Sequence, residues 1–348
     1  MRLLAFLLYS LSAVLPDAEE GILLKKIGEQ ILRFQTKDGA ILMKPCEENE
    51  NYLIPYFSNF ASIGLSIAYK ATKEEKYLKS AKAWLEWYVK HLNPDGTIYD
   101  YKGSPSELNP TMDYDSSDAY AGTFITAIWF AYSVKPDKLF LKKIYPAVKK
   151  AIEGIKLTLQ DDNLTFAKLT HPVKYLMDNV ETWQGLHYAG KIAELLGFRD
   201  DARYFSQLAS SMLDSLEKQF WDAENHCYAW AIYTNGAKAS GLKRWYPEQM
   251  ANLMAIAWLP PSSRRKELYV FLRKELVTKI KQGADELIWW AMASQGAGAK
   301  EDTELFLFKL LKGDFLSLPP YQLGHLARII YCEGKGEREG FNQNSLKE

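Results

Sequence analysis

Two short clusters of acidic residues have the spacing that paired-carboxylate chemistry requires. Asp115 and Asp118 are three positions apart, and so are Asp178 and Glu181. Residues three apart on a helix are neighbours on one face, so the members of each pair can share a face. Cleavage of a glycosidic bond needs a protonated carboxyl that gives its proton to the leaving oxygen. It also needs an ionised carboxylate that activates water or attacks directly. The two clusters therefore predict hydrolysis of a glycoside.

The neighbours of each carboxyl suggest its role. Glu181 lies one turn from Asp178 and two positions before Trp183, and a nearby second carboxylate raises one pKa of a pair. We therefore expect Glu181 to be the general acid. Asp115 or Asp118, beside serine hydroxyls at a helix start, is expected to be the base, because a helix N-terminus favours the ionised form. The favoured mechanism is inverting.

The same clusters have a purely structural interpretation. Ser, Asp and Asn are ordinary N-caps, and Asp178 followed by Glu181 three residues later resembles a capping box. The functional interpretation is favoured because both clusters are surrounded by aromatic and polar residues typical of a sugar groove, although each ring could instead pack in the core. The residues expected to bind substrate are Tyr56, Asp113, Tyr120, Trp183, Trp245, Tyr246, Glu248, Glu286 and Trp289.

Helical segments of two kinds alternate along the chain and would position these residues. Apolar residues at spacings of three and four predict amphipathic helices, most clearly over 205–220 and also over 18–35, 74–92, 137–159, 262–281 and 299–312. A second set is apolar on most faces and is expected inside, over 55–71, 116–134, 178–197, 247–259, 284–296 and 320–333. The two sets interleave as six helical hairpins with a repeat of about 55 residues.

The connections between these helices also alternate. Each inner helix ends in a short turn, but most inner helices are entered through a longer segment, so the long segments gather on one face. The inner helices are apolar on too many faces to line an open solenoid. We therefore predict an all-α fold, a closed (α/α)6 barrel over residues 18–335, followed by a polar tail over 336–348.

Composition limits the remaining possibilities. Lys plus Arg and Asp plus Glu both number 43 among 348 residues, which argues against nucleic acid as the main partner. The aromatic fraction of 14% suits a groove lined by flat rings. Three cysteines without CxxC, and five histidines without ligand spacing, predict no metal site and no cofactor. Residues 113–117 begin like a calcium loop, but the required Gly and Glu do not follow.

The first residues resemble an export signal. Met1 and Arg2 precede an apolar stretch over residues 3–15, which is too short to span a bilayer. We expect residues 1–17 to be a signal peptide and the protein to be exported to a periplasm or the exterior. The alternative is that this stretch forms a buried first element of the domain.

Several segments are similar to the six-hairpin glycosidase superfamily. They are 54–59 (IPYFSN), 95–100 (DGTIYD), 115–124 (DSSDAYAGTF), 177–181 (MDNVE) and 245–248 (WYPE). The resemblance covers nearly the whole mature chain and implies an (α/α)6 barrel that acts on carbohydrate. The superfamily includes glucoamylase-like, trehalase-like, cellulase-like and unsaturated uronyl hydrolases, so the substrate stays open. The double-Glu acid motif of glucoamylases is absent, and Glu181 shares only the topological place of an acid.

Other classes of protein remain as alternatives. A polysaccharide lyase would abstract a proton from a uronic acid with Tyr or His and would need Arg or Lys to neutralise the carboxylate. The long loops offer few such cations apart from Lys243 and Arg244. A terpene-cyclase-like toroid would need an apolar cavity, whereas this face is rich in carboxylates. A non-catalytic sugar-binding protein could keep the barrel without the chemistry.

Overall fold

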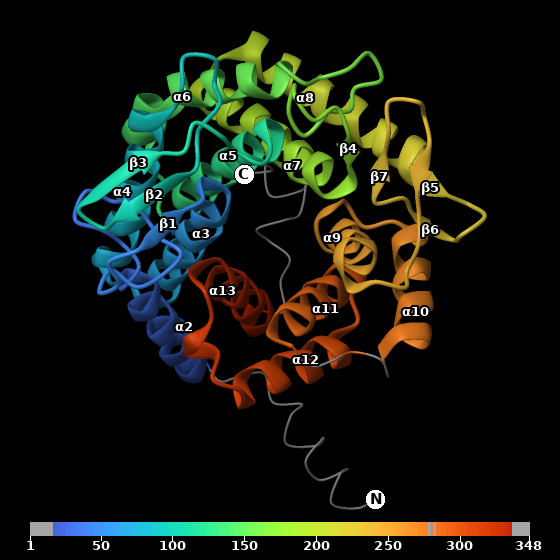
Figure 1. Cartoon of the computed structure of the whole chain (residues 1–348). Coiled ribbons are helices and arrows are strands. Elements are labelled where there is room, and N and C mark those ends of the chain that lie inside the picture. The colour runs from blue at the N-terminus through green and yellow to red at the C-terminus, as the bar shows by residue number, and fades with distance from the viewer. Residues whose placement is uncertain (1–16, 278–279, 281–282, 336–348) are drawn as a thin grey trace, which may run out of the picture.

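The computed structural model describes residues 17–277, 280 and 283–335. Six helical hairpins form a closed ring with two concentric layers (Figure 1). The inner layer consists of α3 (Pro55–Thr72), α5 (Ser117–Val134), α7 (Leu176–Leu196), α9 (Met250–Trp258), α11 (Ala284–Ala297) and α13 (Pro320–Lys335). The outer layer consists of α2 (Asp17–Leu32), α4 (Glu75–His91), α6 (Lys138–Lys156), α8 (Arg199–Ser215), α10 (Ser263–Leu276) and α12 (Lys300–Lys312). The predicted (α/α)6 barrel is confirmed.

The ring closes where the last inner helix packs against the first. A Cβ added to Gly64 on α3 would lie only 2.8 Å from the Cα of Gly324 on α13. The two helix backbones therefore touch, which larger side chains would prevent. This contact distinguishes a closed barrel from an open solenoid, as the sequence predicted.

Burial follows the predicted alternation of helix types. On the inner helix α5, every residue from Ser117 to Ile128 is buried, so no face is left for water. On the outer helix α8, only Phe205, Leu208, Ala209 and Met212 are buried, and they form the single stripe that an amphipathic helix presents to a core. Polar residues cover most of the rest of α8. The layer that each helix occupies can thus be read from how far its apolar residues spread around it.

Strands occur only as short pieces of the loops that lead into inner helices, within the part of the chain described. One antiparallel sheet has the order β1 (Asn51–Leu53), β2 (Tyr101–Ser104), β3 (Glu107–Pro110), with Tyr101 opposite both Leu53 and Pro110. A second has the order β4 (Lys174–Tyr175), β7 (Ala231–Ile232), β8 (Lys238–Ala239), and β5 (Trp221–Asp222) pairs with β6 (Cys227–Tyr228). These pairings fix the long loops at the end of the ring where the inner helices begin.

Three further turns belong to the same loops. Wide π-helical turns η1 (Leu216–Phe220) and η2 (Trp245–Gln249) follow α8 and precede α9, and a 3-10 turn η4 (Phe315–Ser317) precedes α13. The expected signal segment and the expected tail lie outside the described residues, apart from Asp17, which opens α2. Over the ranges given above, no helix has both the length and the apolar character needed to cross a membrane.

Candidate functional site

The first turns of α3, α5 and α7 bring the two acidic clusters together. All inner helices start at the loop-bearing end of the ring, so Tyr56, Asp118 and Asp178 lie in first turns at one end. Helices α5 and α7 approach closely because Gly122 faces the backbone of the partner helix: an added Cβ would lie 2.6 Å from the carbonyl oxygen of Glu181. The close approach explains why carboxyls from both helices influence one another.

Glu181, which the sequence selected as the acid, is enclosed in the structure. Its side chain is 1% exposed, and its Oε1 accepts a hydrogen bond of 2.6 Å from the hydroxyl of Tyr56. Burial raises its pKa well above the usual value, the Tyr56 hydrogen bond lowers it, Asp118 raises it, and Arg328 lowers it. Glu181 is therefore a buried carboxyl whose charge depends on a few fixed neighbours, and Tyr56 occupies one of its oxygens.

Asp178 differs from Glu181 in its exposure. The residue is partly exposed on the first turn of α7. Its pKa is raised well above the usual value, first by burial among protein groups and then by Asp118, Glu181 and Asp115. It thus combines contact with solvent and a strong tendency to hold a proton. Those two properties are what a general acid requires.

Tyr246 lies near the same carboxyl and projects from the loop that leads into α9. The residue as a whole is 64% exposed. The pKa of its hydroxyl is raised, first by desolvation among protein groups and then by the charges of Asp178, Asp115 and Glu181. An exposed ring beside an acid-prone carboxyl is a suitable surface for a sugar to stack on. The pKa of Tyr175, the residue before α7, is also raised, first by burial and then by charges that include Asp178 and Asp115.

Asp118 is fully enclosed, with no exposed surface. Its Oδ2 accepts a hydrogen bond of 2.5 Å from Thr165 Oγ1, and its Oδ1 accepts one of 2.8 Å from the amide of Ala119. Burial nevertheless raises its pKa to about 7. Thr165 is fixed in turn by Asn179, which accepts its amide hydrogen and donates to its carbonyl. Asp118 thus fastens the loop before α7 onto α5.

Asp115 is exposed at the end of the loop that enters α5. Its amide donates a long hydrogen bond of 3.5 Å to the hydroxyl of Tyr120, which itself donates to Asp100 Oδ1 at 2.9 Å. The ring of Tyr120 stacks on Tyr56 at 5.9 Å between centroids. Tyr120 thus connects the supports of both clusters, and Asp115 is the exposed carboxylate of its pair.

The capping interpretation is wrong for the second cluster. The N-cap of α7 is Tyr175, which makes no side-chain capping hydrogen bond, and Asp178 and Glu181 both lie inside the helix. The N-cap of α5 is Ser116, again without a side-chain cap. Of the four carboxyls, Asp118 is the one that contributes to a helix start, through the Ala119 amide.

The remaining residues expected to bind substrate divide by exposure. Trp183, Trp289 and Tyr120 are buried. Trp183 stacks on His187 with 5.6 Å between ring centroids, and Trp289 packs against Trp258 with 5.1 Å between them. Core packing, the alternative role for an aromatic side chain, describes these three positions.

Polar partners fix several others. Asp113 is exposed and pairs with Lys168 at 2.8 Å. Trp245 donates from Nε1 to Asp285 Oδ2 at 3.0 Å. Glu286 is half-buried on the first turn of α11.

Glu248, expected to bind substrate, serves the loop instead. It is buried and accepts hydrogen bonds from Arg244 Nε at 2.6 Å and from the amides of Lys243 and Arg244. Burial raises its pKa, but these hydrogen bonds outweigh burial and lower it overall. Its charge therefore holds the turn before α9, and Tyr246 is the exposed member of that segment.

Two residues near the site were not selected from the sequence. Arg328 on α13 is 4% exposed, with its guanidinium 5.0 Å from the ring of Trp258, and it lowers the pKa of Glu181. The feature of the sequence that could have pointed to Arg328 is its position as a charged residue within an apolar run of an inner helix. Asp100, which accepts from Tyr120, has a pKa raised to about 6 by burial. Among the described residues, no three His, Cys, Asp or Glu side chains are placed to hold a metal ion.

No protein-family model matches the chain, and no curated protein matches it in sequence. Solved structures do match in fold. A family 63 mannosylglycerate hydrolase from Thermus thermophilus, in complex with glucose, aligns over 89% of this chain and 99% of its own, with a TM-score of 0.66 and 11% identity. An alpha-amylase from Clostridium perfringens aligns over 89% and 98%, with a TM-score of 0.61 and 9% identity.

A third match is a family 8 endoglucanase, Cel10, from Klebsiella pneumoniae. It aligns over 88% of this chain and 98% of its own, with a TM-score of 0.56 and 12% identity. At these identities the likeness establishes the fold, and the similarity to six-hairpin glycosidases is confirmed at that level.

Proposed function

We propose that the chain is a glycoside hydrolase of a poly- or oligosaccharide, in which Asp178 is the general acid and Asp115 the base. One observation carries the proposal. Asp178 is a partly exposed carboxyl whose pKa is raised well above its usual value, and it lies near an exposed carboxylate, Asp115, and an exposed ring, Tyr246. The fold shared with several glycosidases supports the reaction class.

Exposure distinguishes the acid from its neighbour on α7. Glu181, expected as the acid by analogy of position, is 1% exposed and accepts the Tyr56 hydroxyl. Glu181 therefore offers a substrate oxygen little access unless its surroundings rearrange. Asp178 needs no such rearrangement, and Glu181 behind it raises its pKa. We therefore assign Glu181 the role of raising the pKa of the acid when Glu181 is ionised.

The same reasoning separates the two candidate bases. Asp118 has no exposed surface and two of its hydrogen bonds go to Thr165 and Ala119, whereas Asp115 is exposed. Asp115 also contributes to the pKa of Asp178, although no hydrogen bond joins the two side chains in the described part of the chain. The proposal keeps the inverting mechanism that the sequence favoured, in which Asp115 activates a water molecule while Asp178 protonates the leaving oxygen.

The alternative of a lyase has less support. A lyase must neutralise the carboxylate of a uronic acid with a cation. The loop cations Lys168, Lys174 and Arg244 are already paired with Asp113, Asp162 and Glu248, respectively. Of the two cations named from the sequence, Lys243 is left exposed and has no ion pair in the described structure. An acid-rich surface of this kind repels a uronate and suits a neutral sugar.

The test is turnover of aryl glycosides and oligosaccharides of several neutral sugars by the wild type and by Asp178→Asn, Asp115→Asn and Glu181→Gln. Loss of the acid or the base should lower turnover by about two to four orders of magnitude. Substrates with good leaving groups should suffer less from Asp178→Asn, because they need less protonation, whereas Asp115→Asn should affect all substrates alike. Asp161→Asn, which changes an exposed aspartate in a neighbouring loop, is the matched control.

The outcome decides between the assignments. Proton NMR of the first product formed shows its anomeric configuration and tests inversion. Full activity of folded Asp178→Asn together with loss in Glu181→Gln would transfer the acid role to Glu181. Full activity of all three variants would refute paired-carboxylate hydrolysis at this site.

A further inference from the structure

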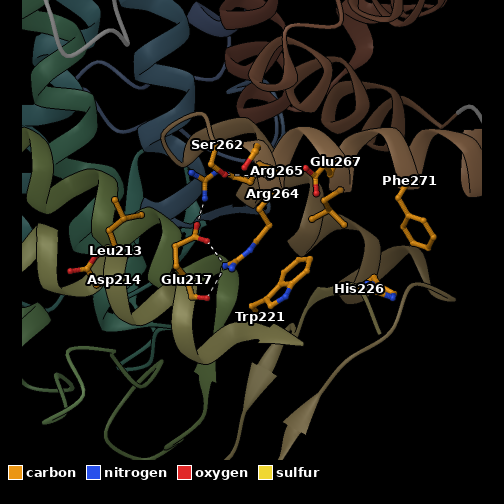
Figure 2. Close-up of a pocket in the computed structure, with 12 residues that line it drawn as sticks. Leu213, Asp214, Glu217, Trp221, His226, Ser262, Arg264, Arg265, Glu267 and Phe271 are labelled. Atoms are coloured by element: carbon orange, nitrogen blue, oxygen red, sulfur yellow. Dashed lines mark hydrogen bonds and ion pairs between the residues drawn. The ribbon is translucent and has the colours of Figure 1, made fainter. Parts of the chain in front are cut away.

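A cavity outside the ring has the composition of a ligand site and shares no residue with the candidate active site. It lies between α8 with η1 on one side and α10 on the other, beside the β5–β6 hairpin (Figure 2). Its volume is about 740 Å³, within the usual range for small-molecule sites. Apolar side chains of Leu213, Trp221, Leu268 and Phe271 line it together with polar ones of Asp214, Glu217, His226, Ser262, Ser263, Arg264, Arg265 and Glu267.

A fixed network of charges forms one wall. Glu217 accepts hydrogen bonds from Arg264 Nη1 at 2.8 Å, from the hydroxyl of Tyr228 at 3.0 Å and from Arg265 Nη1. Arg265 is 5% exposed and also donates to the carbonyl of Pro260. The guanidinium of Arg264 lies 4.8 Å from the ring centroid of Trp221 and so holds that ring in place. A ligand would therefore meet a wall already ordered, which reduces the entropy cost of binding.

One buried donor in this wall has no acceptor. Among the described residues, none accepts a hydrogen bond from the Nε of Arg265, although its other guanidinium nitrogens are bonded. Native proteins usually pair buried donors of this kind. Asp214 and Glu267, which also line the cavity, are exposed carboxylates with no ion pair in the described structure. The unpaired Nε thus lies within the wall, and the cavity itself offers free acceptors beside an aromatic ring.

Charge limits the class of ligand. Both guanidiniums of the lining are bound to Glu217, and Asp214 and Glu267 add two carboxylates, so the lining has one negative charge in excess. A phosphate or an acidic sugar would be repelled. In Figure 2 Trp221 lies between Glu217 and His226, with Asp214 beyond Glu217. A flat ring flanked by polar groups matches a sugar, which has an apolar C–H face and hydroxyls that both donate and accept.

We propose that this cavity is a second carbohydrate site, which binds a neutral oligosaccharide without cleaving it. The site goes beyond the proposed hydrolase activity and does not depend on it. Trp221 would support the sugar ring, and Asp214 and Glu267 would accept its hydroxyls.

The experiment is isothermal titration calorimetry of the full chain with maltohexaose, cellohexaose, xylohexaose and chitohexaose. The Asp178→Asn variant is used as the parent for the sugars that chromatography shows it leaves uncleaved, so that turnover does not interfere. The proposal expects at least one of these sugars to bind with a component that Trp221→Ala weakens at least tenfold. Trp129→Ala, which removes a half-buried tryptophan stacked on Tyr188 away from the cavity, is the control and should leave binding unchanged.

A second variant covers the case in which Trp221→Ala does not fold. Asp214→Ala combined with Glu267→Ala changes only exposed side chains and should weaken the same component. Two results would overturn the second site. One is that no sugar binds, and the other is that every sugar that binds does so equally well in Trp221→Ala and in the variant with Asp214→Ala and Glu267→Ala. The two proposals fail separately: cavity binding can persist when substitutions of Asp178 and Asp115 prove to have no effect on turnover, and turnover can depend on Asp178 when the cavity binds nothing.

Discussion

Replacing Asp118 by Asn tests whether the enclosed carboxyl carries a proton in the folded protein. Asn has the shape of a protonated Asp. Its Oδ1 can keep the Ala119 amide, and the Thr165 hydroxyl can rotate to accept from its amide group. The substitution therefore removes the ionisation and little else. Because Asp118 has no exposed surface, solvent does not screen the effect.

The size of the effect follows from the pKa. The pKa of Asp118 rises from the ordinary 3.8 to about 7 in the folded chain, chiefly through burial. Below the lower pKa both the folded and the unfolded states are protonated. Between the two values only the folded state holds the proton, so stability falls as the pH rises through this window. A pKa difference of about 3 corresponds to a penalty on the order of 4 kcal/mol, which is complete above the folded-state pKa.

The assay is urea unfolding at constant ionic strength from about pH 4 to pH 8. Stability of Asp118→Asn relative to the wild type should rise with pH by on the order of 4 kcal/mol over this range. Asp161→Asn, which changes an exposed aspartate, should show no such gain. A constant difference between Asp118→Asn and the wild type at every pH would refute the reasoning, because Asp118 would then be ionised in the folded chain. Loss of turnover beyond about a hundredfold in Asp118→Asn, together with full turnover in Asp115→Asn, would transfer the role of base to Asp118.

Three further results are expected. Tyr56→Phe removes the 2.6 Å hydrogen bond to buried Glu181. It should lower the free energy of unfolding by about 1.5–3 kcal/mol where Glu181 is ionised and by less at low pH. An equal loss of stability in urea unfolding at all pH values would contradict this. In the wild type, kcat/KM should fall as pH rises through the raised pKa of Asp178, and this alkaline limb should be absent in Asp178→Asn; a limb that persists would identify another acid. Gly122→Ala places a Cβ 2.6 Å from the carbonyl oxygen of Glu181 and should destabilise the fold by about 1–3 kcal/mol. A melting temperature equal to that of the wild type would exclude the close approach of α5 and α7.

The ring architecture could be predicted because it depends on local patterns. The spread of apolar residues around each helix gives its layer, and the lengths of the connections give the end at which the loops gather. The start of the fourth inner helix was predicted less well. The sequence indicated a helix from 247, whereas α9 begins at Met250, after the wide turn η2. Arg244, the residue before that turn, binds the carboxylate of Glu248, a contact that no periodicity reveals.

The sequence located the candidate site but could not assign the roles of its residues. Asp178 and Glu181 have the same local surroundings in the chain, and what separates them is Tyr56, which lies 125 positions away from Glu181 on another helix. Burial of Trp183 and Trp289 likewise depends on which rings pack against them in the folded chain. A single sequence shows which residues occur in the loop-bearing end, but not which of them face water.

The arrangement of the four carboxyls bears on how the proposed acid keeps its proton. Asp178 is at the surface of the cluster, and Asp118 and Glu181 lie enclosed behind it. Each enclosed carboxyl, once it is ionised, adds to the pKa of Asp178 in addition to burial. Tyr56 and Arg328 lower the pKa of Glu181, so they favour the charged form of the residue that keeps the proton on Asp178. The hydroxyl of Tyr56 and the guanidinium of Arg328 thus act on the acid through Glu181, and neither needs to touch the substrate.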